Sequence, residues 1–577
     1  MDPLGVALGT AALVSTVLDV FRLVTSFRAY PESSGILFRQ LELEREVLHR
    51  WATEVGLHPP SEASSRCVIP PDLLPLVDRS VAAIGALLGQ ATSIKAAKEV
   101  LEVRVSDLKV VHERLQNEIA NHEQSRLARS LARLGWAISE EDRLKDLIST
   151  IHSYNTSLHN LIPKPLQVSL DGSLMQMLLA DQDKDRLLEI QQASSHWRKA
   201  LSVAASVTAL RQRQASLPPS TNQLLVDRSK LSSLGSDMSR HLTQYTLKDK
   251  KIAVLIEWRA CHAPLNSAEK TAYLNTCLDL ARLLHASQNL PEYRTLDCVG
   301  VIDDIEFLPH CRIGLVYRVP TAAPTMPSAL SESSVRAYTL HDLINHKGFA
   351  RLKLEQRFEI ARSLATGLHR VFISRWYHKN LTSKNILFFA RARGRAEDEK
   401  YILSNTNFVA HPFLSGFDYA RPDSPDEMTI KPEVNEFGDR YRHPQCTNPA
   451  TRHTVPFSRR FDIYSLGVIL MELGRWETVD TMHKDFTAQR LKAAKKGQQE
   501  PGAPPPGLES FQEYLRTRCV DSLAFRMGTI YTDAVRFCFH DAKLVTSAEL
   551  GLNEDNENVL ILRFNKEVVA ELVKCTA

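Results

Sequence analysis

The chain has 577 residues, of which 44% are hydrophobic and 24% are charged. This length is too great for one ordinary hydrophobic core, so two or three domains are expected. The composition is that of a soluble globular protein, and a formal net charge of +4 gives no indication of nucleic-acid binding. The nine cysteines form no Cys-x-x-Cys pair and no Cys/His group at zinc spacing, which fits a reducing compartment and predicts no metal site.

The N-terminal segment, residues 4–24, is apolar, and Asp19 and Arg22 are its first charged residues. A signal peptide is not expected, because the segment has no basic n-region. As a membrane span it is marginal, since the charges interrupt a run that should reach about 20 residues. Gly5 and Gly9 form a Gly-x-x-x-Gly pair, which permits close helix packing in membranes but is weak evidence alone. The segment is therefore either a buried helix of an all-α domain or a membrane-active helix that can be released.

Helical periodicity continues as far as Pro163. Apolar residues at three- and four-residue steps lead to Trp51, with charged residues between them. A final stretch carries an apolar stripe until Pro163 stops it. This pattern predicts an all-α bundle. The expected helices cover residues 37–51, 73–88, 94–119, 127–134 and 136–161.

This region resembles the HeLo domain of fungal heterokaryon-incompatibility proteins. The resemblance rests on the apolar N-terminal helix, the amphipathic helix that reaches Trp51, and the block from Trp136 to Pro163. It covers residues 1–165. It implies a bundle that self-associates and whose N-terminal helix, on activation, is released, enters the membrane and makes it leaky. The residues that it marks as membrane-active are Leu4, Gly5, Leu8, Gly9, Leu13, Val17, Leu18 and Phe21.

Residues 166–225 are expected to form a helical connector. Helical stretches are predicted at 174–190 and 196–214, and Pro218 and Pro219 end the second one. We interpret the segment as a linker. The alternative is a brace that transmits a change between domains, which a sequence alone does not show.

From residue 251 the pattern becomes that of a mixed domain. Residues 252–258 are a short run rich in β-branched residues, and similar runs follow at 296–302 and 312–320. A helix is expected between them, at 268–286. The sequence therefore predicts an α+β domain over residues 226–577.

Residues 377–387 have the spacing of a protein-kinase catalytic loop, His-Arg-Asp-Leu-x-x-x-Asn. His378 and Asn385 match its first and last positions, and Lys379 stands at the arginine. The departure is Asn380, which occupies the position of the catalytic aspartate. An amide has no useful basicity near neutral pH, so it cannot take the proton of a substrate hydroxyl.

Two further kinase positions are also changed. Glu257 aligns with the phosphate-pairing lysine, and no glycine-rich loop precedes it. Gly416 aligns with the magnesium-binding aspartate and is followed by Phe417 and Asp418. The carboxylate of Asp418 is displaced by two residues, or about 6 Å along an extended chain. We therefore do not expect it to reach the same ion.

Other motifs favour the kinase fold without its chemistry. Pro444 and Gln445 resemble the end of an activation segment, with Gln445 in place of glutamate. Asp462 and Gly467 match the helix that anchors the larger kinase lobe. Residues 245–577 therefore resemble the pseudokinases that are fused to HeLo domains in filamentous fungi. The order of bundle, connector and pseudokinase is also similar to that of the mixed-lineage kinase domain-like proteins of animals.

The sequence thus predicts a multidomain α and α+β protein, in which a HeLo-like bundle precedes a helical connector and a bilobal protein-kinase-like fold. Phosphoryl transfer depends on positioning and charge neutralisation, so loss of the lysine, base, metal ligand and glycine loop predicts no enzymatic activity. No cofactor is expected, although Asn385 leaves weak ATP binding open.

Three functions are compatible with this reading. The preferred one is a cell-death or incompatibility effector in the cytoplasm, which moves to the plasma membrane on activation and binds lipid there. The second is a cytosolic scaffold that binds protein partners and has no membrane action. The third, a residual kinase that uses Asp418 for metal binding, has the least support. The upstream signalling protein is not identified by the sequence.

Overall fold

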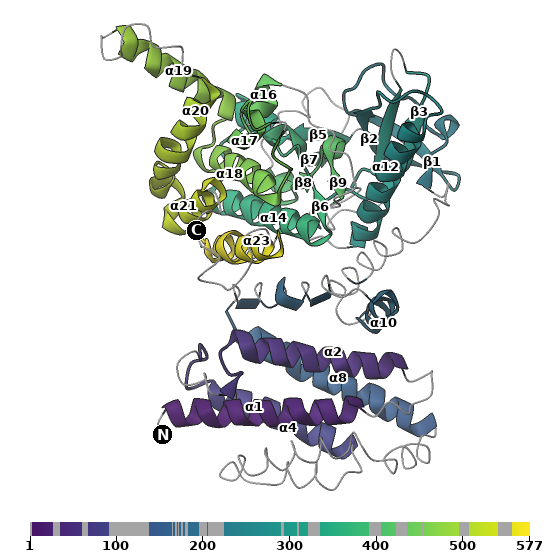
Figure 1. Cartoon of the computed structure of the whole chain (residues 1–577), viewed down its shortest axis with the longest axis vertical. Helices are drawn as coiled ribbons and strands as arrows, with labels where there is room; N and C mark the ends of the chain where they lie inside the picture. Colours follow the sequence, from purple (N-terminus) through teal and green to yellow (C-terminus); the bar gives the residue numbers. More distant parts are fainter. Residues whose placement is uncertain are drawn as a thin grey trace. The chain divides into compact units, whose positions relative to one another are not determined.

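The computed structural model of the chain divides into two compact units, Met1–Ala215 and Ser216–Ala577 (Figure 1). The helices expected at 94–119 and 127–134, and all but one residue of 196–214, lie outside the described residues. The structure describes residues 3–26, 35–60, 67–91, 138–163, 183–194, 224–289, 293–307, 311–320, 335–391, 406–422, 435–452, 454–495, 507–540 and 557–577, with a few single positions between 166 and 205.

The described part of the N-terminal unit is helical. It contains α1 (Pro3–Ser26), α2 (Gly35–Glu54), α4 (Leu74–Ala91), α8 (Ile138–Leu161) and α10 (Lys184–Ser194). Helix α1 packs against α2 and α4, and α2 also contacts α8 and α10. Figure 1 shows α1, α2, α4 and α8 running side by side. Helix α10 lies within the sequence expected to be a connector, yet it packs against the bundle.

The core of this unit combines apolar packing with a few buried polar contacts. Trp51 is 1% exposed, and its Nε1–H donates to the carbonyl oxygen of Leu158 at 3.0 Å. The buried carboxylate of Glu44 accepts from Asn155 Nδ2 at 2.7 Å and lies 2.8 Å from His152 Nδ1. These contacts fix α2 against α8, because Trp51 Nε1, Glu44 and Asn155 Nδ2, which burial removes from water, find partners on the facing helix.

The C-terminal unit begins with a four-stranded antiparallel sheet in the order β1-β2-β4-β3. Lys248 and Asp249 both have positive φ and form a two-residue turn between β1 and β2, which leaves no room for a longer loop. Helix α12 (Ala268–Ala286) is capped by Ser267 and packs against β3 and β4. The strands are β1 (His241–Leu247), β2 (Lys250–Ala260), β3 (Cys298–Asp304) and β4 (Arg312–Arg318).

The rest of this unit is mainly helical and is built around α18 (Arg459–Arg475), which is buried along almost its whole length. Gly467 permits close packing there, because a Cβ at this position would lie 2.7 Å from the Cβ of Cys538 on α21. The other helices are α13 (Leu340–Asn345), α14 (Leu354–Ile373), α16 (Glu436–Asp439), α17 (Pro444–Thr447), α19 (Val479–Lys495), α20 (Leu508–Tyr514), α21 (Ala524–Phe539), α23 (Glu557–Phe564) and α24 (Ala570–Lys574).

Short strands hold the predicted catalytic-loop region. Strand β7 (Ile386–Arg391) pairs with β5 (Val335–Thr339) and β8 (Phe413–Leu414), and β6 (Trp376–Tyr377) pairs with β9 (Arg421–Pro422). The protein therefore has a helix-rich N-terminal unit and a mixed helix and sheet C-terminal unit, as the sequence predicts in coarse terms.

Candidate functional site

Asp462 holds the start of the predicted catalytic loop. Its two carboxylate oxygens accept from the backbone N–H groups of His378 and Lys379, each at 2.8 Å. Burial raises the pKa of Asp462 to about 7, and the two N–H groups oppose that rise. Lys379 has a φ of 65°, so the backbone turns sharply at this point. The contact joins α18 to the loop, which gives Asp462 a structural role.

His378 packs inside the protein as a neutral ring. It is completely buried, and its ring centroid lies 4.5 Å from that of Phe417. Burial lowers the pKa of His378 to about 3. An imidazole that stays neutral throughout the physiological range does not serve as a proton carrier, so the His378–Phe417 pair is a packing contact.

The amide at the predicted catalytic position is occupied by an internal contact. Asn380 Nδ2 donates to Asp418 Oδ2 at 3.0 Å, and the carbonyl oxygen of Asn380 accepts from Asn385 Nδ2 at 2.6 Å. Burial, with a smaller contribution from Glu257, raises the pKa of Asp418 to about 6. The structure thus brings these residues together, but in contacts with one another.

Arg240 contacts both Glu257 and Asn385, and the sequence did not predict this role. Its Nε donates to Glu257 Oε1 at 2.6 Å, and its Nη1 donates to the carbonyl oxygen of Lys384 at 2.7 Å. Its Nη2 donates to Asn385 Oδ1 and, at 3.1 Å, to Ser415 Oγ. Arg240 immediately precedes β1, and no motif marks it.

Glu257 and Gly416 complete this Arg240 cluster, which we define as Arg240, Glu257, Asn385, Ser415 and Gly416. Both carboxylate oxygens of Glu257 accept from the N–H of Gly416, at 3.0 and 3.1 Å. A Cβ at Gly416 would lie 2.2 Å from Asn385 Cγ, so an aspartate fits there only if Asn385 moves. Gly416 also has a φ of 76°, which favours glycine. Position 416 therefore offers no carboxylate for a metal ion, and the positive charge in the Arg240 cluster is the guanidinium of Arg240.

The remaining predicted positions lie outside the Arg240 cluster. Pro444 is the first residue of α17, and Gln445 Oε1 accepts from Arg460 Nη2 at 2.5 Å. Gly467 faces α21, as described above. Among the residues that the structure describes, no group of three or more His, Cys, Asp or Glu side chains is placed to hold a metal ion.

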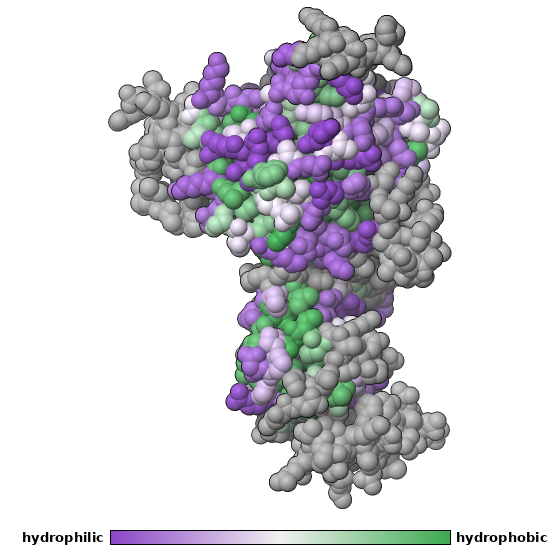
Figure 2. Space-filling view, turned by 90° about the vertical axis from the view of Figure 1, so that its left-hand side faces the viewer, coloured by the Kyte–Doolittle hydropathy of each residue, from purple (hydrophilic) through white to green (hydrophobic). Residues whose placement is uncertain are grey.

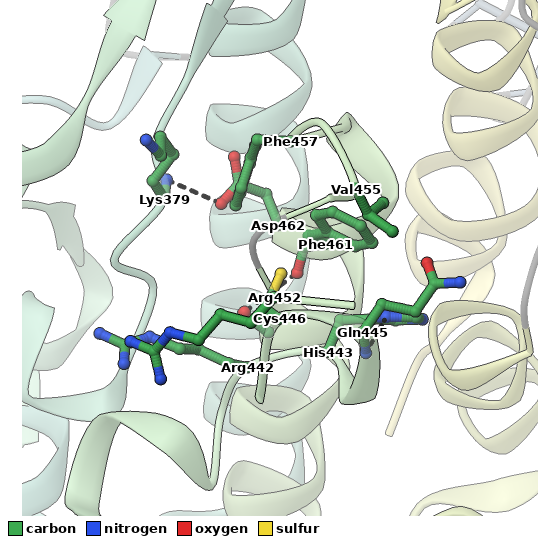
Figure 3. Close-up of a pocket in the computed structure, with 11 residues that line it drawn as sticks. Lys379, Arg442, His443, Gln445, Cys446, Arg452, Val455, Phe457, Phe461 and Asp462 are labelled. Carbon is green, nitrogen blue, oxygen red and sulfur yellow. Dashed lines mark hydrogen bonds between the residues drawn. The ribbon is translucent and has the colours of Figure 1, made fainter. Parts of the chain in front are cut away.

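A cavity of about 50 Å³ adjoins Asp462 (Figure 3). Lys379, Cys446, Phe457 and Phe461 are among its lining residues. Figure 3 shows the hydrogen bond between the Lys379 backbone and Asp462 at its edge. Arg240 and Glu257 do not line the cavity. This volume has room for a few water molecules, so the cavity does not suggest a nucleotide site.

The predicted membrane-active residues lie on α1 in two different environments. Val17, Leu18 and Phe21 are buried in the bundle, whereas Leu8 is 44% exposed near the N-terminal end. Gly5 is also exposed, while Gly9 and Leu13 are partly buried. The side chain of Leu4 lies outside the described residues. Figure 2 shows apolar residues in green, gathered on the N-terminal unit and scattered among polar residues on the C-terminal unit.

Within the described residues, one helical segment, Gly5–Arg22, is long and apolar enough to cross a membrane, and 56% of it is buried. By length and composition this segment is suited both to a bilayer and to a protein core. Its location in a packed bundle shows the second state.

Two family models match the chain. Residues 4–190 match the HeLo family, which is described as prion-inhibition and propagation. This match covers α1 to most of α10 and supports the HeLo resemblance of the N-terminal unit, which points to a role related to cell death or heterokaryon incompatibility. Residues 317–558 match a domain of unknown function, DUF7580, so the kinase resemblance of that region remains a prediction. No curated protein matches the chain.

Proposed function

We propose that the protein is a cell-death or heterokaryon-incompatibility effector in which the C-terminal unit restrains a HeLo bundle. On activation, α1 is released, the bundles self-associate, and α1 permeabilises the membrane. The observation that carries this proposal is the apolar segment Gly5–Arg22, which is packed in the bundle yet long enough to cross a bilayer. The match of residues 4–190 to the HeLo family supports it.

Two hydroxyl groups of α1 have hydrogen-bond acceptors within the same helix. The hydroxyls of Thr10 and Thr16 donate to the carbonyl oxygens of Val6 and Ala12, one turn earlier on the same helix. Release from the bundle therefore leaves these hydroxyls paired, as a hydrocarbon environment requires. The apolar face of α1 that packs in the core, which includes Phe21, contacts lipid tails equally well after release.

The C-terminal unit is proposed to be a kinase-like fold that does not transfer phosphate. Three observations support this proposal. Asn380 supplies no base, Gly416 supplies no carboxylate, and the sequence before Glu257 contains no glycine-rich loop to cover phosphates. The guanidinium of Arg240 bridges Glu257 and Asn385, so neither ATP nor a metal ion is needed to hold the Arg240 cluster together. We therefore propose a regulatory unit without a cofactor.

The proposed location before activation is the cytoplasm, and the proposed location afterwards is the plasma membrane. A scaffold that binds protein partners without acting on membranes is the alternative. The two functions differ in one measurable respect, because only the effector makes lipid vesicles leak.

The test uses residues 1–215 and dye-filled vesicles with and without anionic lipid. The fragment includes α10, because Arg39 on α2 contacts Glu189 at 2.6 to 2.9 Å and Gln40 donates to the carbonyl oxygen of Ala193 at 3.1 Å. We expect dye release from the wild-type fragment.

The Leu8→Asp variant tests whether α1 causes the leakage. Leu8 is 44% exposed, so the variant should keep the fold but lose most of the leakage, since an aspartate inside a bilayer costs roughly 3 kcal/mol. Val68→Asp is the matched control, because Val68 is 53% exposed and lies outside α1. The proposal fails if the fragment releases no dye at any concentration, or if Leu8→Asp leaks as much as wild type.

A further inference from the structure

In the described part of the C-terminal unit, one large apolar side chain is almost completely exposed. Phe525, in the first turn of α21, is 98% exposed, whereas Leu491, another exposed apolar residue of this unit, is 57% exposed. Helix α21 is interrupted at Gly528, which has φ 79° and ψ 168°, so residues 524–527 form a separate turn at a corner of the surface. A Cβ at Gly528 would meet no atom within 4 Å, so the space around this corner is open.

Three guanidinium groups lie beside this corner and converge on the C-terminal end of α18. Arg357 Nη1 donates to the carbonyl oxygen of Gly474 at 2.9 Å. Arg351 Nη2 and Arg526 Nη1 both donate to the carbonyl oxygen of Arg475, each at 3.2 Å. Arg351 and Arg526 are exposed, and Arg357 is buried beneath them. We call Phe525, Arg351, Arg357 and Arg526 the Phe525 corner.

The Phe525 corner carries an excess of positive charge. The end of a helix contributes only about half of a negative charge, against three guanidinium groups. Burial and the neighbouring guanidinium groups lower the pKa of Arg351 and of Arg357. The guanidinium of Arg475 is paired with Glu477, at 2.9 and 3.1 Å, so this adjacent carboxylate already has a cation of its own. The buried Nε of Arg357 also has no hydrogen-bond partner. An anion at this corner would offset the repulsion.

We propose that the Phe525 corner binds the surface of an anionic membrane. The planar guanidinium groups of Arg351 and Arg526 match the geometry of lipid phosphates, and Phe525 enters the region between headgroups and acyl chains. A single protruding ring suits a fluid bilayer, which needs no preformed pocket to receive it. A stable protein interface, by contrast, buries about 1,200 to 2,000 Å² in total, far more than one phenyl ring supplies.

This contact belongs to the C-terminal unit and is separate from α1. The proposal would place a second lipid contact on the protein, and it does not require that α1 insert or that vesicles leak. Binding without leakage would therefore contradict the proposed function and leave the Phe525 corner supported. Leakage by residues 1–215, together with unchanged vesicle binding by Phe525→Ala, would support the proposed function and contradict the role of the Phe525 corner.

The experiment is flotation of the full chain with phosphatidylcholine vesicles that contain either no phosphatidylserine or 30% of it. All proteins carry Leu8→Asp, which removes the contribution of α1. We expect Phe525→Ala to lower the partition coefficient on the anionic vesicles at least about tenfold, and Arg526→Gln to lower it about fivefold. Raising the salt concentration from 0.1 to 0.5 M should weaken the binding of the parent protein to anionic vesicles.

Two exposed positions serve as matched controls. Leu491→Ala removes an apolar side chain of α19, and Arg516→Gln removes a guanidinium that is paired with Glu513 at 2.7 Å. Both variants should bind as their parent does, and all variants should unfold at the same temperature. The inference is overturned if Phe525→Ala binds anionic vesicles as strongly as its parent. Equal binding to vesicles with and without phosphatidylserine would also overturn it.

Discussion

Replacing Arg240 by methionine should destabilise the C-terminal unit by about 3 kcal/mol. Glu257 is 2% exposed, and without Arg240 its carboxylate keeps only the N–H of Gly416 as a partner. Breaking a buried ion pair by removing one partner costs about 3 to 5 kcal/mol, and the partial exposure of Arg240, 26% of its side chain, favours the lower value.

A double-mutant cycle isolates the interaction from the loss of packing. Glu257→Gln keeps an acceptor for Gly416 and leaves Arg240 bonded to Asn385 and Ser415, so it should cost about 1 to 2 kcal/mol. The double variant then contains no unpaired buried charge. We expect a coupling energy of about 2 kcal/mol between the two positions.

Urea unfolding of residues 216–577, followed by tryptophan fluorescence, measures these values. Trp258 lies next to Glu257 on β2 and reports on this part of the sheet. If Arg240→Met costs less than about 1 kcal/mol, or if the costs of the two single variants simply add, then the guanidinium does not hold the Arg240 cluster together and the reasoning is refuted.

Two further predictions concern other polar contacts. His341 lies 3.5 Å from Asp480, and carboxylate contacts with Asp342 and Asp480 raise its pKa to about 9. This raised pKa contributes stability below pH 6.5 that is lost as pH rises through 9. Between pH 6 and pH 9.5, the wild type should therefore lose about 1 to 2 kcal/mol more of its unfolding free energy than His341→Gln does, as measured by urea unfolding at both pH values. A variant with an unchanged pH dependence would contradict this assignment. Trp51→Phe should destabilise residues 1–215 by about 2 kcal/mol, because the carbonyl oxygen of Leu158 loses its donor, and thermal unfolding that is unchanged would count against that contact.

Elements with a strong local pattern were predictable from the sequence. The helix expected at 268–286 has these bounds in α12, and the helix expected to carry Asp462 and Gly467 is α18. Both have a clear serine cap, at Ser267 and Ser458, and apolar spacing that depends only on neighbouring residues. Strand β1 was not predicted, because its residues alternate weakly and few of them are buried.

The candidate site was predictable only where a motif marks it. The sequence places Asn380, Gly416 and Asp418 near one another because they occupy known positions of the kinase pattern, and the structure brings them together. Arg240 was missed for a physical reason. Its partners lie 17 to 175 residues away in the chain, so only the fold reveals that they meet. The role of Glu257 likewise depends on that distant guanidinium.

The central claim is that the C-terminal unit restrains a membrane-active bundle. Dye release from the same anionic vesicles by residues 1–215 and by the full chain, at equal concentrations, tests it most directly. The account predicts rapid release by the fragment and at least tenfold slower release by the full chain. Equal release by both proteins would contradict the restraint, and no release by the fragment would contradict the membrane activity itself.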